Sequence, residues 1–157
     1  MKISIKPYED LTLEELYEII RLRVEVFINE QDCNYQDLDG ADNKAFHVMI
    51  IEDGLLAAYS RLFVSGIKYE EATIGRVITK KEYRGRNLGE ALMRESMAFL
   101  LSKGEPSIKL SSQTYAEGFY RKLGFERTSR APYLEDTIPH VEMIYQGGGS
   151  YGQQEKL

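Results

Sequence analysis

The stretch from Val77 to Met93 constrains the fold of this chain more than any other. A β-branched run ends at two lysines, a short basic loop carries Gly85 and Gly89, and apolar residues at helical spacing follow from Leu88 onward. The pattern predicts a strand, a tight loop and a helix. Backbone N–H groups at a helix N-terminus, together with the positive end of the helix dipole, bind anions such as phosphate. The loop is therefore a candidate phosphate site, although a strand-to-helix turn with solvated basic residues has the same composition.

The residues after the glycines exclude both familiar nucleotide loops. A P-loop requires Gly-Lys-Ser/Thr, whereas Gly89 is followed by Glu90 and Ala91. A dinucleotide fingerprint requires three glycines at fixed spacing, and only Gly85 and Gly89 are present in this loop. A phosphate bound here would need a loop of another kind.

The composition is that of one globular domain with an acidic balance. The 157 residues suffice for a single substantial core. The 20 basic and 25 acidic residues give a formal charge of -5, which argues against nucleic acid as the main partner.

No apolar run approaches the roughly 18 residues of a membrane span, and the first residues form no apolar leader, so we expect a cytoplasmic protein without membrane contact. His47 and His140 lack ligand-spaced companions, so we expect no metal site.

Strand and helix patterns alternate along residues 1–146, which we expect to form the domain. Thr12 and Glu15 make a capping box, and Asp53-Gly54 marks a hairpin turn. The expected elements are a strand at 3–5, a helix at 13–27, a hairpin at 46–64, a strand at 72–79, a helix from 88 to about 103, a strand at 107–112, a short helix from 116 ended by Gly124, a strand that begins at Phe125, and a last strand at 141–145. The crossover helix makes its two flanking strands parallel, which predicts a mixed α/β sheet of about six to seven strands with helices on both faces. Residues 147–157 are Gly-rich and are expected to be a flexible tail.

A polar, acidic segment from Glu30 to Asp42 follows the first predicted helix. Its Asp-x-Asp-Gly run suggests a calcium loop. With Gly40 at the sixth position, however, Tyr35 and Phe46 occupy the first and last places, where aspartate and glutamate are required. The segment either attracts a cationic acceptor molecule or is a solvated loop.

Two motifs resemble the hallmarks of the GNAT acyltransferases, the family related to the Gcn5 acetyltransferase. Arg84-Gly85-Arg86-Asn87-Leu88-Gly89 is similar to the family's acetyl-CoA pyrophosphate loop, Arg/Gln-x-x-Gly-x-Gly/Ala, with Asn87 where the family usually has glycine. Asparagine is the non-glycine residue that best tolerates positive φ, so the loop conformation is compatible with it. Ala116-x-x-Phe119-Tyr120-x-x-x-Gly124-Phe125 resembles the second hallmark, a short helix beside the cofactor thioester that is followed by a strand.

Further motifs resemble the ElaA-like branch of this family. They are Arg23-x-x-Val26-Phe27-x-x-Glu30-Gln31, Tyr35-Gln36-Asp37-x-Asp39-Gly40, Ile74-Gly75-Arg76-Val77-Ile78 and Ile138-Pro139-His140, and they spread over most of residues 16–145. The resemblance implies the GNAT acyltransferase fold with acetyl-CoA as co-substrate. It leaves the acceptor open, as a primary amine of a small molecule or of a peptide, and it is compatible with a homodimer.

The resemblance also implies roles for individual residues in a direct attack of the amine on the acetyl carbonyl. Val77, Ile78 and Thr79 present backbone to the pantetheine arm. The pyrophosphate is enclosed by Gly85, Arg86, Asn87, Leu88, Gly89 and Glu90. Arg84 and Arg86 are its charged candidate ligands, or else solvated rim residues. Tyr120 matches the tyrosine that often protonates the departing CoA thiolate, and the alternative is that it only orders the thioester sulfur.

The general base is not settled by the sequence. Glu71 is the first candidate, because it shares a strand face with Thr73 and Val77 if the alternation holds. Glu30, Asp39 and His140 are weaker candidates. A non-catalytic acyl-CoA-binding module is the alternative function, favoured by the missing base motif and by Asn87.

Overall fold

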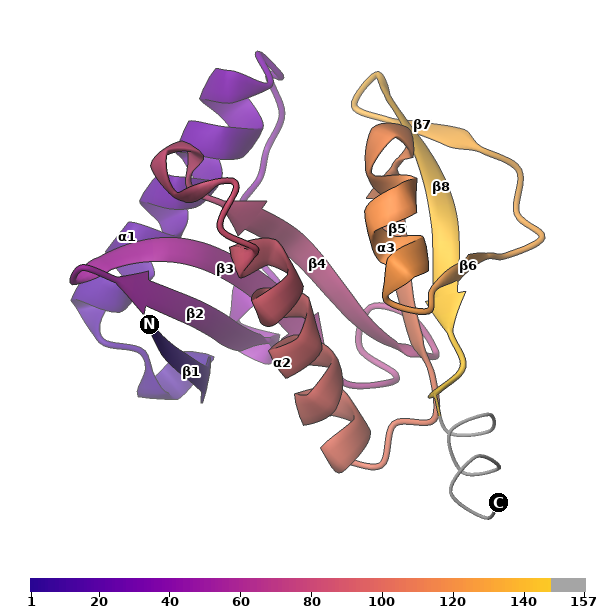
Figure 1. Cartoon of the computed structure of the whole chain (residues 1–157), viewed down its shortest axis with the longest axis horizontal. Helices are drawn as coiled ribbons and strands as arrows, with labels where there is room; N and C mark the ends of the chain where they lie inside the picture. The colour runs from indigo at the N-terminus through magenta and orange to yellow at the C-terminus, as the bar shows by residue number, and fades with distance from the viewer. Residues whose placement is uncertain (148–157) are drawn as a thin grey trace.

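The computed structural model describes residues 1–147, which form one sheet with helices on both of its faces (Figure 1). The strands are β1 (Lys2–Pro7), β2 (Phe46–Glu52), β3 (Leu55–Phe63), β4 (Ala72–Thr79), β5 (Ile108–Gln113), β6 (Glu126–Arg127), β7 (Tyr133–Glu135) and β8 (Ile138–Tyr145). The helices are α1 (Leu13–Arg23), α2 (Leu88–Ser102) and α3 (Glu117–Lys122), with a π-helical segment η2 (Val24–Glu30) after α1. Single 3-10 turns are η1 (Tyr8–Asp10), η3 (Asp42–Lys44), η4 (Lys81–Tyr83) and η5 (Thr114–Ala116).

The sheet runs in the order β1-β2-β3-β4-β5-β8-β6, and β7 pairs with β8 outside that path. The described residues form eight strands, one more than the upper limit expected, because the short β7 was not predicted; the predicted strand after Gly124 is the two-residue β6. The predicted hairpin and the predicted strands at 72–79 and 107–112 are confirmed within one or two residues. The predicted tail falls on residues 148–157, outside the described part except for Gly147. No helix among the described residues has the length and apolar character to cross a membrane.

β4 and β5 are the one parallel pair among the eight described strands, and they stay together over a short distance only. Their register joins Ala72 to Ile108 and Thr73 to Lys109. Beyond Thr73 the two strands diverge, so that Figure 1 shows β1–β4 and β5–β8 as two arms that open away from each other. Most of β4 therefore has no partner strand on the side that faces β5.

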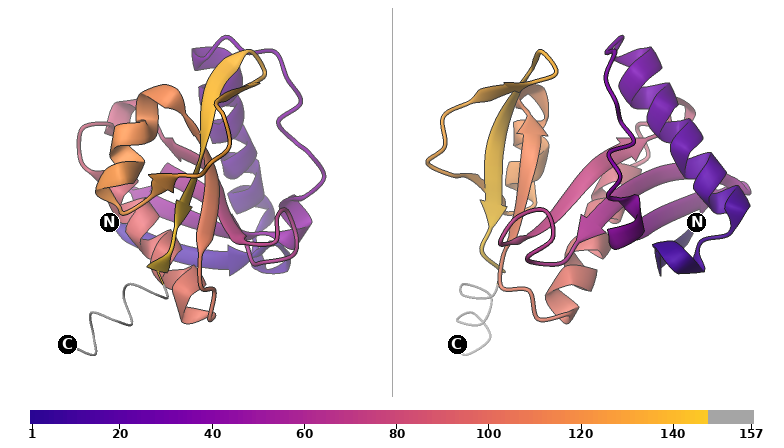
Figure 2. Two further views of the ribbon diagram at one scale, coloured as in Figure 1. Left: turned by 90° about the vertical axis from the view of Figure 1, so that its right-hand side faces the viewer. Right: turned by 180° about the vertical axis from the view of Figure 1, so that it is seen from behind.

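The two faces of the sheet carry separate cores, which confirms the prediction of helices on both sides. α2 packs on one face, where Leu92, Met93 and Leu100 belong to the larger apolar cluster. α1 packs on the other face, where Ile19 and Leu22 join a smaller cluster. The view from behind in Figure 2 brings α1 to the front of the sheet and leaves α2 beyond it.

A β-bulge interrupts β4 where it leaves its regular pairing with β3. Gly75 pairs with Arg61 and Ile78 pairs with Tyr59, so two residues of β4 lie opposite one residue of β3. Arg76, the first of the two, has a φ of 51°, a left-handed conformation that is uncommon for a residue with a side chain. The simple alternation that we assumed from residue 71 to residue 77 breaks here, because the extra residue rotates the later part of the strand onto other faces.

The first helix begins as predicted and ends differently. Thr12 accepts from the N–H of Glu15, and the Glu15 side chain accepts from the N–H of Thr12, which confirms the capping box. The expected continuous helix to residue 27 is wrong in its second part, because from Val24 to Glu30 the chain widens into a π-helix. π-Helical segments are rare in proteins, and those that occur are often found at functional sites.

Three of the four aspartates in the acidic segment, Asp37, Asp39 and Asp42, are bound by buried arginines, so the segment is more than a solvated loop. Arg23, 1% exposed, donates from Nε to Asp37 Oδ2 at 2.7 Å and from a terminal nitrogen to Asp42 Oδ1 at 2.7 Å. Arg61, 2% exposed, binds both oxygens of Asp39 at 2.8 Å. The sequence interpretation failed because it could not place two arginines from other elements beneath the loop.

Arg76 adds the β4 bulge to the same network. Its Nε lies 2.7 Å from Asp37 Oδ1, without the alignment of a hydrogen bond, and a terminal nitrogen donates to the Asp37 carbonyl at 3.0 Å. Tyr35 donates its hydroxyl to the same Asp37 oxygen at 2.7 Å. The three arginines therefore tie α1, β3 and β4 to one loop.

His47 lies beneath the network as a buried neutral group. Its Nε2–H donates to the carbonyl of Asp42 at 2.9 Å, which leaves Nδ1 to accept the hydroxyl of Tyr59 at 2.6 Å. Burial lowers the pKa of His47 below its ordinary value of about 6.5.

We expect Arg23→Met to lower the free energy of unfolding by about 3–5 kcal/mol, because it leaves Asp37 and Asp42 buried with fewer partners. Urea unfolding followed by circular dichroism measures this loss. The matched control is Arg21→Met on the same helix, since Arg21 is exposed and pairs with Glu18 at 3.6 Å only. A surface pair of that kind contributes about 1 kcal/mol or less. Equal effects of the two changes would show that the buried network does not stabilise the fold.

We expect the free energy of unfolding to fall as the pH drops from 7.5 to 5.5. Below about pH 6.5 the unfolded chain binds a proton at His47 that the folded chain does not bind. One such group contributes a slope of at most about 1.4 kcal/mol per pH unit. Urea unfolding at four pH values measures the slope, and His47→Gln should reduce it. An unchanged slope in that variant would contradict the assignment.

Candidate active site

A pocket of about 330 Å³ lies at the N-terminal end of α2. It is lined by Thr79, Tyr83, Arg84, Gly85, Asn87, Leu88, Gly89, Glu90, Phe119, Lys122 and Leu123. All of the loop residues predicted to enclose a pyrophosphate line this pocket except Arg86. The predicted loop thus forms much of the wall of this pocket, and Phe119 and Lys122 of α3 lie on another side of it.

The loop adopts a conformation that its sequence makes accessible. Asn87 is the N-cap of α2 with φ 60° and ψ 23°, in the left-handed region that asparagine tolerates. Gly85 has φ 84°, which only glycine adopts freely. No side chain caps the helix, so the N–H groups of its first turn remain open to an anion.

Two of the predicted cationic ligands are engaged with protein groups. Arg84 binds both carboxylate oxygens of Glu30, at 2.8 and 3.0 Å, and its Nε donates to the Thr79 carbonyl at 3.0 Å. The guanidinium of Arg86 lies 5.0 Å from the ring centre of Tyr83. Arg84 therefore joins the π-helix to the loop, and its contact with a phosphate would compete with Glu30.

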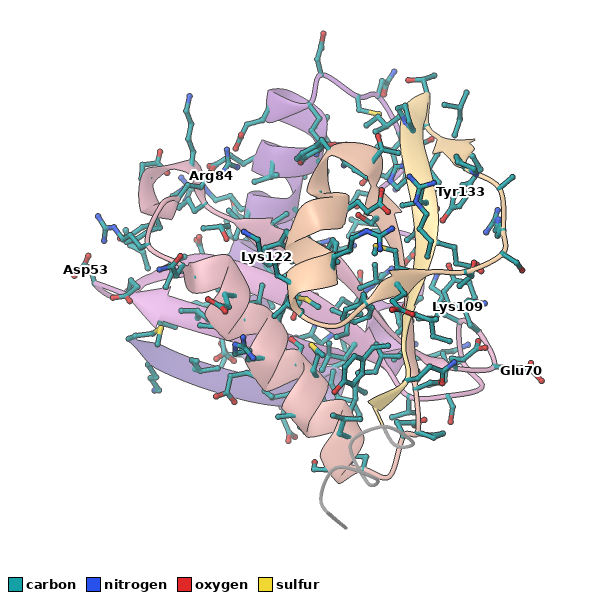
Figure 3. All side chains as sticks on the ribbon, turned by 45° about the vertical axis from the view of Figure 1, so that its right-hand side comes forward. Asp53, Glu70, Arg84, Lys109, Lys122 and Tyr133 are labelled. Carbon is teal, nitrogen blue, oxygen red and sulfur yellow. The ribbon has the colours of Figure 1, made fainter. Side chains whose placement is uncertain are left out.

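Lys122 is a pocket residue that the sequence analysis missed. Figure 3 shows it between α3 and the N-terminal end of α2, with Arg84 on another side of that end. Its position depends on how α3 packs against α2, for which no local pattern exists. An ammonium group at a helix N-terminus adds positive potential where an anion binds.

A larger cleft of about 1040 Å³ adjoins the pocket between the two arms of the sheet. The two cavities share Thr79, Arg84, Gly89 and Phe119. Val77, Ile78 and Thr79 line the cleft along the part of β4 that has left β5. An extended ligand can therefore reach from the helix N-terminus into the cleft along a strand edge.

Tyr120 lines the cleft from α3 and is 9% exposed. Burial, and next the neighbouring Tyr115, raise the pKa of its phenol well above the ordinary value. Its hydroxyl has no protein hydrogen-bond partner within residues 1–147. The phenol is therefore protonated at neutral pH and free to donate to a ligand.

The structure places Glu71 away from the other predicted site residues. Glu71 precedes β4, and its carboxylate lies 3.4 Å from Nζ of Lys109 on β5. It is not among the residues that line the cleft, although Thr73 is. Its predicted role as the base gains no support from this position.

A polar group on the β7–β8 side of the cleft was not anticipated as a unit. Ser111 donates to Glu135 Oε1 at 3.0 Å and also shares a hydrogen bond with the hydroxyl of Tyr133, which lies beside β8 in Figure 3. His140 lies at 3.5 Å from Glu135, measured from Nε2 to Oε2. β7 was not predicted, so no sequence pattern brought these side chains together. Within residues 1–147, no group of three or more potential ligand side chains is arranged to hold a metal ion.

The chain is similar to known proteins over nearly its whole length. A family model described as "Acetyltransferase (GNAT) domain" matches residues 9–146. A UPF0039 protein of Schizosaccharomyces pombe is 41% identical over 148 residues, covering 91% of this chain and 95% of that protein. Protein ElaA of Escherichia coli is 33% identical over 141 residues, covering 87% and 90%.

Solved structures agree with these relatives. An acyl-CoA N-acyltransferase from Pseudomonas aeruginosa superposes with a TM-score of 0.86 and 37% identity, covering 92% of this chain and 98% of that one. The crystal structure of E. coli ElaA superposes with a TM-score of 0.84 and 30% identity, over the same shares of the two chains. The chain therefore belongs to the GNAT acetyltransferase family, in its ElaA-like branch, and is an acyl-CoA-dependent N-acyltransferase.

Proposed function

We propose that the protein transfers an acetyl group from acetyl-CoA to a primary amine by direct attack within a ternary complex. The observation that carries this proposal is the continuity of the two cavities. An anion pocket at a helix N-terminus opens, through Thr79 and Gly89, into a cleft that contains an unpartnered phenol. One acyl-CoA molecule can occupy both cavities, with its pyrophosphate in the pocket, its pantetheine arm along β4 and its thioester in the cleft beside Tyr120.

In the proposed binding mode, backbone N–H groups make most of the contacts with acyl-CoA, and a charged side chain adds to them. The pyrophosphate accepts from the first-turn N–H groups of α2, where Asn87 and Gly85 allow close approach. Lys122 supplies the nearest ammonium within the pocket lining. The amides of the pantetheine arm pair with the open edge of β4 at Val77–Thr79, as an added strand would.

The proposed chemistry assigns Tyr120 as the general acid. When the amine attacks the thioester carbon and the C–S bond breaks, the CoA sulfur leaves as a thiolate that needs a proton. The phenol of Tyr120 lies in the cleft, is protonated and donates to no protein group within the described residues. Its open hydrogen bond supports catalysis over a module that only binds acyl-CoA.

We expect the wild-type protein to release CoA thiol from acetyl-CoA only when an amine is added, and Tyr120→Phe to slow this release. The slowing should be about 10²- to 10⁴-fold in kcat, the range of general acid catalysis. Acetyl-CoA affinity, measured by calorimetry, should change little. Tyr115→Phe is the matched control, because Tyr115 lines the same cleft but is 82% exposed. A Tyr120→Phe variant with wild-type turnover would leave the phenol with an ordering role only.

We expect Lys122→Ala to weaken acetyl-CoA binding about tenfold while leaving kcat nearly unchanged, because a hydrogen bond to a charged group contributes about 1.5–3 kcal/mol. Calorimetric titration with acetyl-CoA and with CoA measures the loss. Arg121→Ala is the control on the same helix, since Arg121 binds Glu117 at 2.7 Å and does not line the pocket. Equal affinities of the Lys122 variant and the wild type would remove Lys122 from the phosphate site.

A further inference from the structure

The proposed transfer requires a group that removes a proton from the attacking amine. An alkylamine with a pKa near that of lysine is about three units from neutrality at pH 7, so presenting it as a nucleophile costs about 4 kcal/mol. The base has to lie in the cleft with Tyr120. The candidates are therefore the basic side chains of the cleft lining.

Two carboxylates of the cleft are committed to cations. Both oxygens of Glu30 are bound by Arg84. Asp39 is bound by Arg61 and Lys68, and the hydrogen bonds from Arg61 hold its pKa far below the ordinary value. A carboxylate whose pKa is lowered in this way, as that of Asp39 is, is a poor proton acceptor. A third, Asp136, is exposed on the β7–β8 turn, where Cys33 donates to its backbone carbonyl.

His140 is the one imidazole that lines the cleft, and its geometry fixes which nitrogen is basic. Its Nδ1 lies 2.7 Å from the carbonyl oxygen of Ile138. A carbonyl oxygen only accepts, so Nδ1 carries the hydrogen and donates it. In the neutral ring the lone pair is then on Nε2, which faces Glu135.

His140 lies beside a carboxylate and an aromatic ring. Glu135 Oε2 lies 3.5 Å from Nε2, and Ser111 holds the other oxygen of that carboxylate. The ring of Tyr133 stacks on His140 at 6.1 Å between centres, and Arg130 lies 3.7 Å from the centre of the Tyr133 ring. The carboxylate of Glu135 thus lies beside Nε2, whereas the guanidinium of Arg130 contacts the ring of Tyr133.

The fold brings His140 and Tyr120 to the same cavity from adjoining elements. His140 pairs in register with Gln113, the last residue of β5. The chain continues from Gln113 through η5 into α3, which carries Tyr120. All three residues line the cleft. A residue of β8 and a residue of α3 therefore border the same cleft.

We propose that His140 is the general base of the acetyl transfer, with Glu135 receiving the ammonium of the acceptor and stabilising the imidazolium. This inference rests on the proposed acetyltransferase function. His140 Nε2 takes a proton from the ammonium, and the freed amine forms the new C–N bond at the thioester carbon. The C–S bond breaks, Tyr120 protonates the thiolate, and the second proton of the nitrogen returns to the Tyr120 phenolate. The products are the N-acetyl amine, CoA thiol and one proton that leaves from His140.

The test compares His140→Asn with the wild type on two acceptors of similar size. The asparagine amide can still donate to the Ile138 carbonyl, as Nδ1 does, but it lacks a basic nitrogen. Ethylamine is charged at pH 7.5 and needs the base, whereas 2,2,2-trifluoroethylamine is neutral there and does not. We expect His140→Asn to lower kcat/KM about 10²-fold or more with ethylamine and to change it little with the fluorinated amine. Raising the pH toward the pKa of ethylamine should restore the rate of the variant.

Two further measurements separate failure of the base from failure of the function. Glu135→Gln, which can still accept from Ser111, should lower the ethylamine rate by a smaller factor and leave acetyl-CoA affinity unchanged. Tyr120→Phe should slow both acceptors. Equal losses with both amines in His140→Asn, or none, would overturn the role of His140 while leaving the transferase intact. A wild-type protein that binds acetyl-CoA but acetylates neither amine, nor lysine or spermidine, would overturn the proposed function and the base with it.

Discussion

The separation of β4 from β5 is the constraint on which the rest of the site depends. The two strands share a ladder only at Ala72 and Thr73 and then diverge, so backbone groups along the end of β4 face a cleft instead of a partner strand. Buried backbone N–H and C=O groups need partners, and a ligand that carries its own amides can supply them. The same divergence places the N-terminus of α2 and the buried phenol of Tyr120 on the border of one continuous space. Pocket, cleft and reacting groups follow from this single opening.

The buried ion network fixes a loop on one side of that opening. Arg23, Arg61 and Arg76 come from α1, β3 and β4 and converge on aspartates of one loop. Three of the motifs that resemble the ElaA-like branch supply its members Arg23, Asp37 and Arg76. Burying such charges costs desolvation energy, which the ion pairs offset, although Nε of Arg61 and Nε of Arg76 have no hydrogen-bond partner among the described residues. The network also joins the bulge in β4 to the loop that borders the cleft, through the contacts of Arg76 with Asp37.

Local chemistry was sufficient to predict the loop that lines much of the pocket at the N-terminal end of α2. The turn from strand to helix requires positive φ at Gly85 and Asn87, and both residues adopt it easily. Thr12 and Glu15 likewise set the start of α1, because the capping box involves neighbours three positions apart. The crossover helix between two apolar strands determined the parallel pair. Each of these features depends on residues close in the sequence.

The sequence by itself thus determined most of the order of the elements and the turn from strand to helix at Gly85 and Asn87, because periodicity, turn chemistry and capping act over a few residues. Tyr120 was singled out by the resemblance of its motif to a family hallmark. Only the tertiary structure decided that buried arginines bind the acidic segment and that Arg84 pairs with Glu30. It also decided that Lys122 lines the pocket and that Glu135 lies beside His140. These contacts join residues that are distant in the chain or lie on the short strand β7. Their energies depend on desolvation and on the orientation of side chains across elements, which no local pattern encodes.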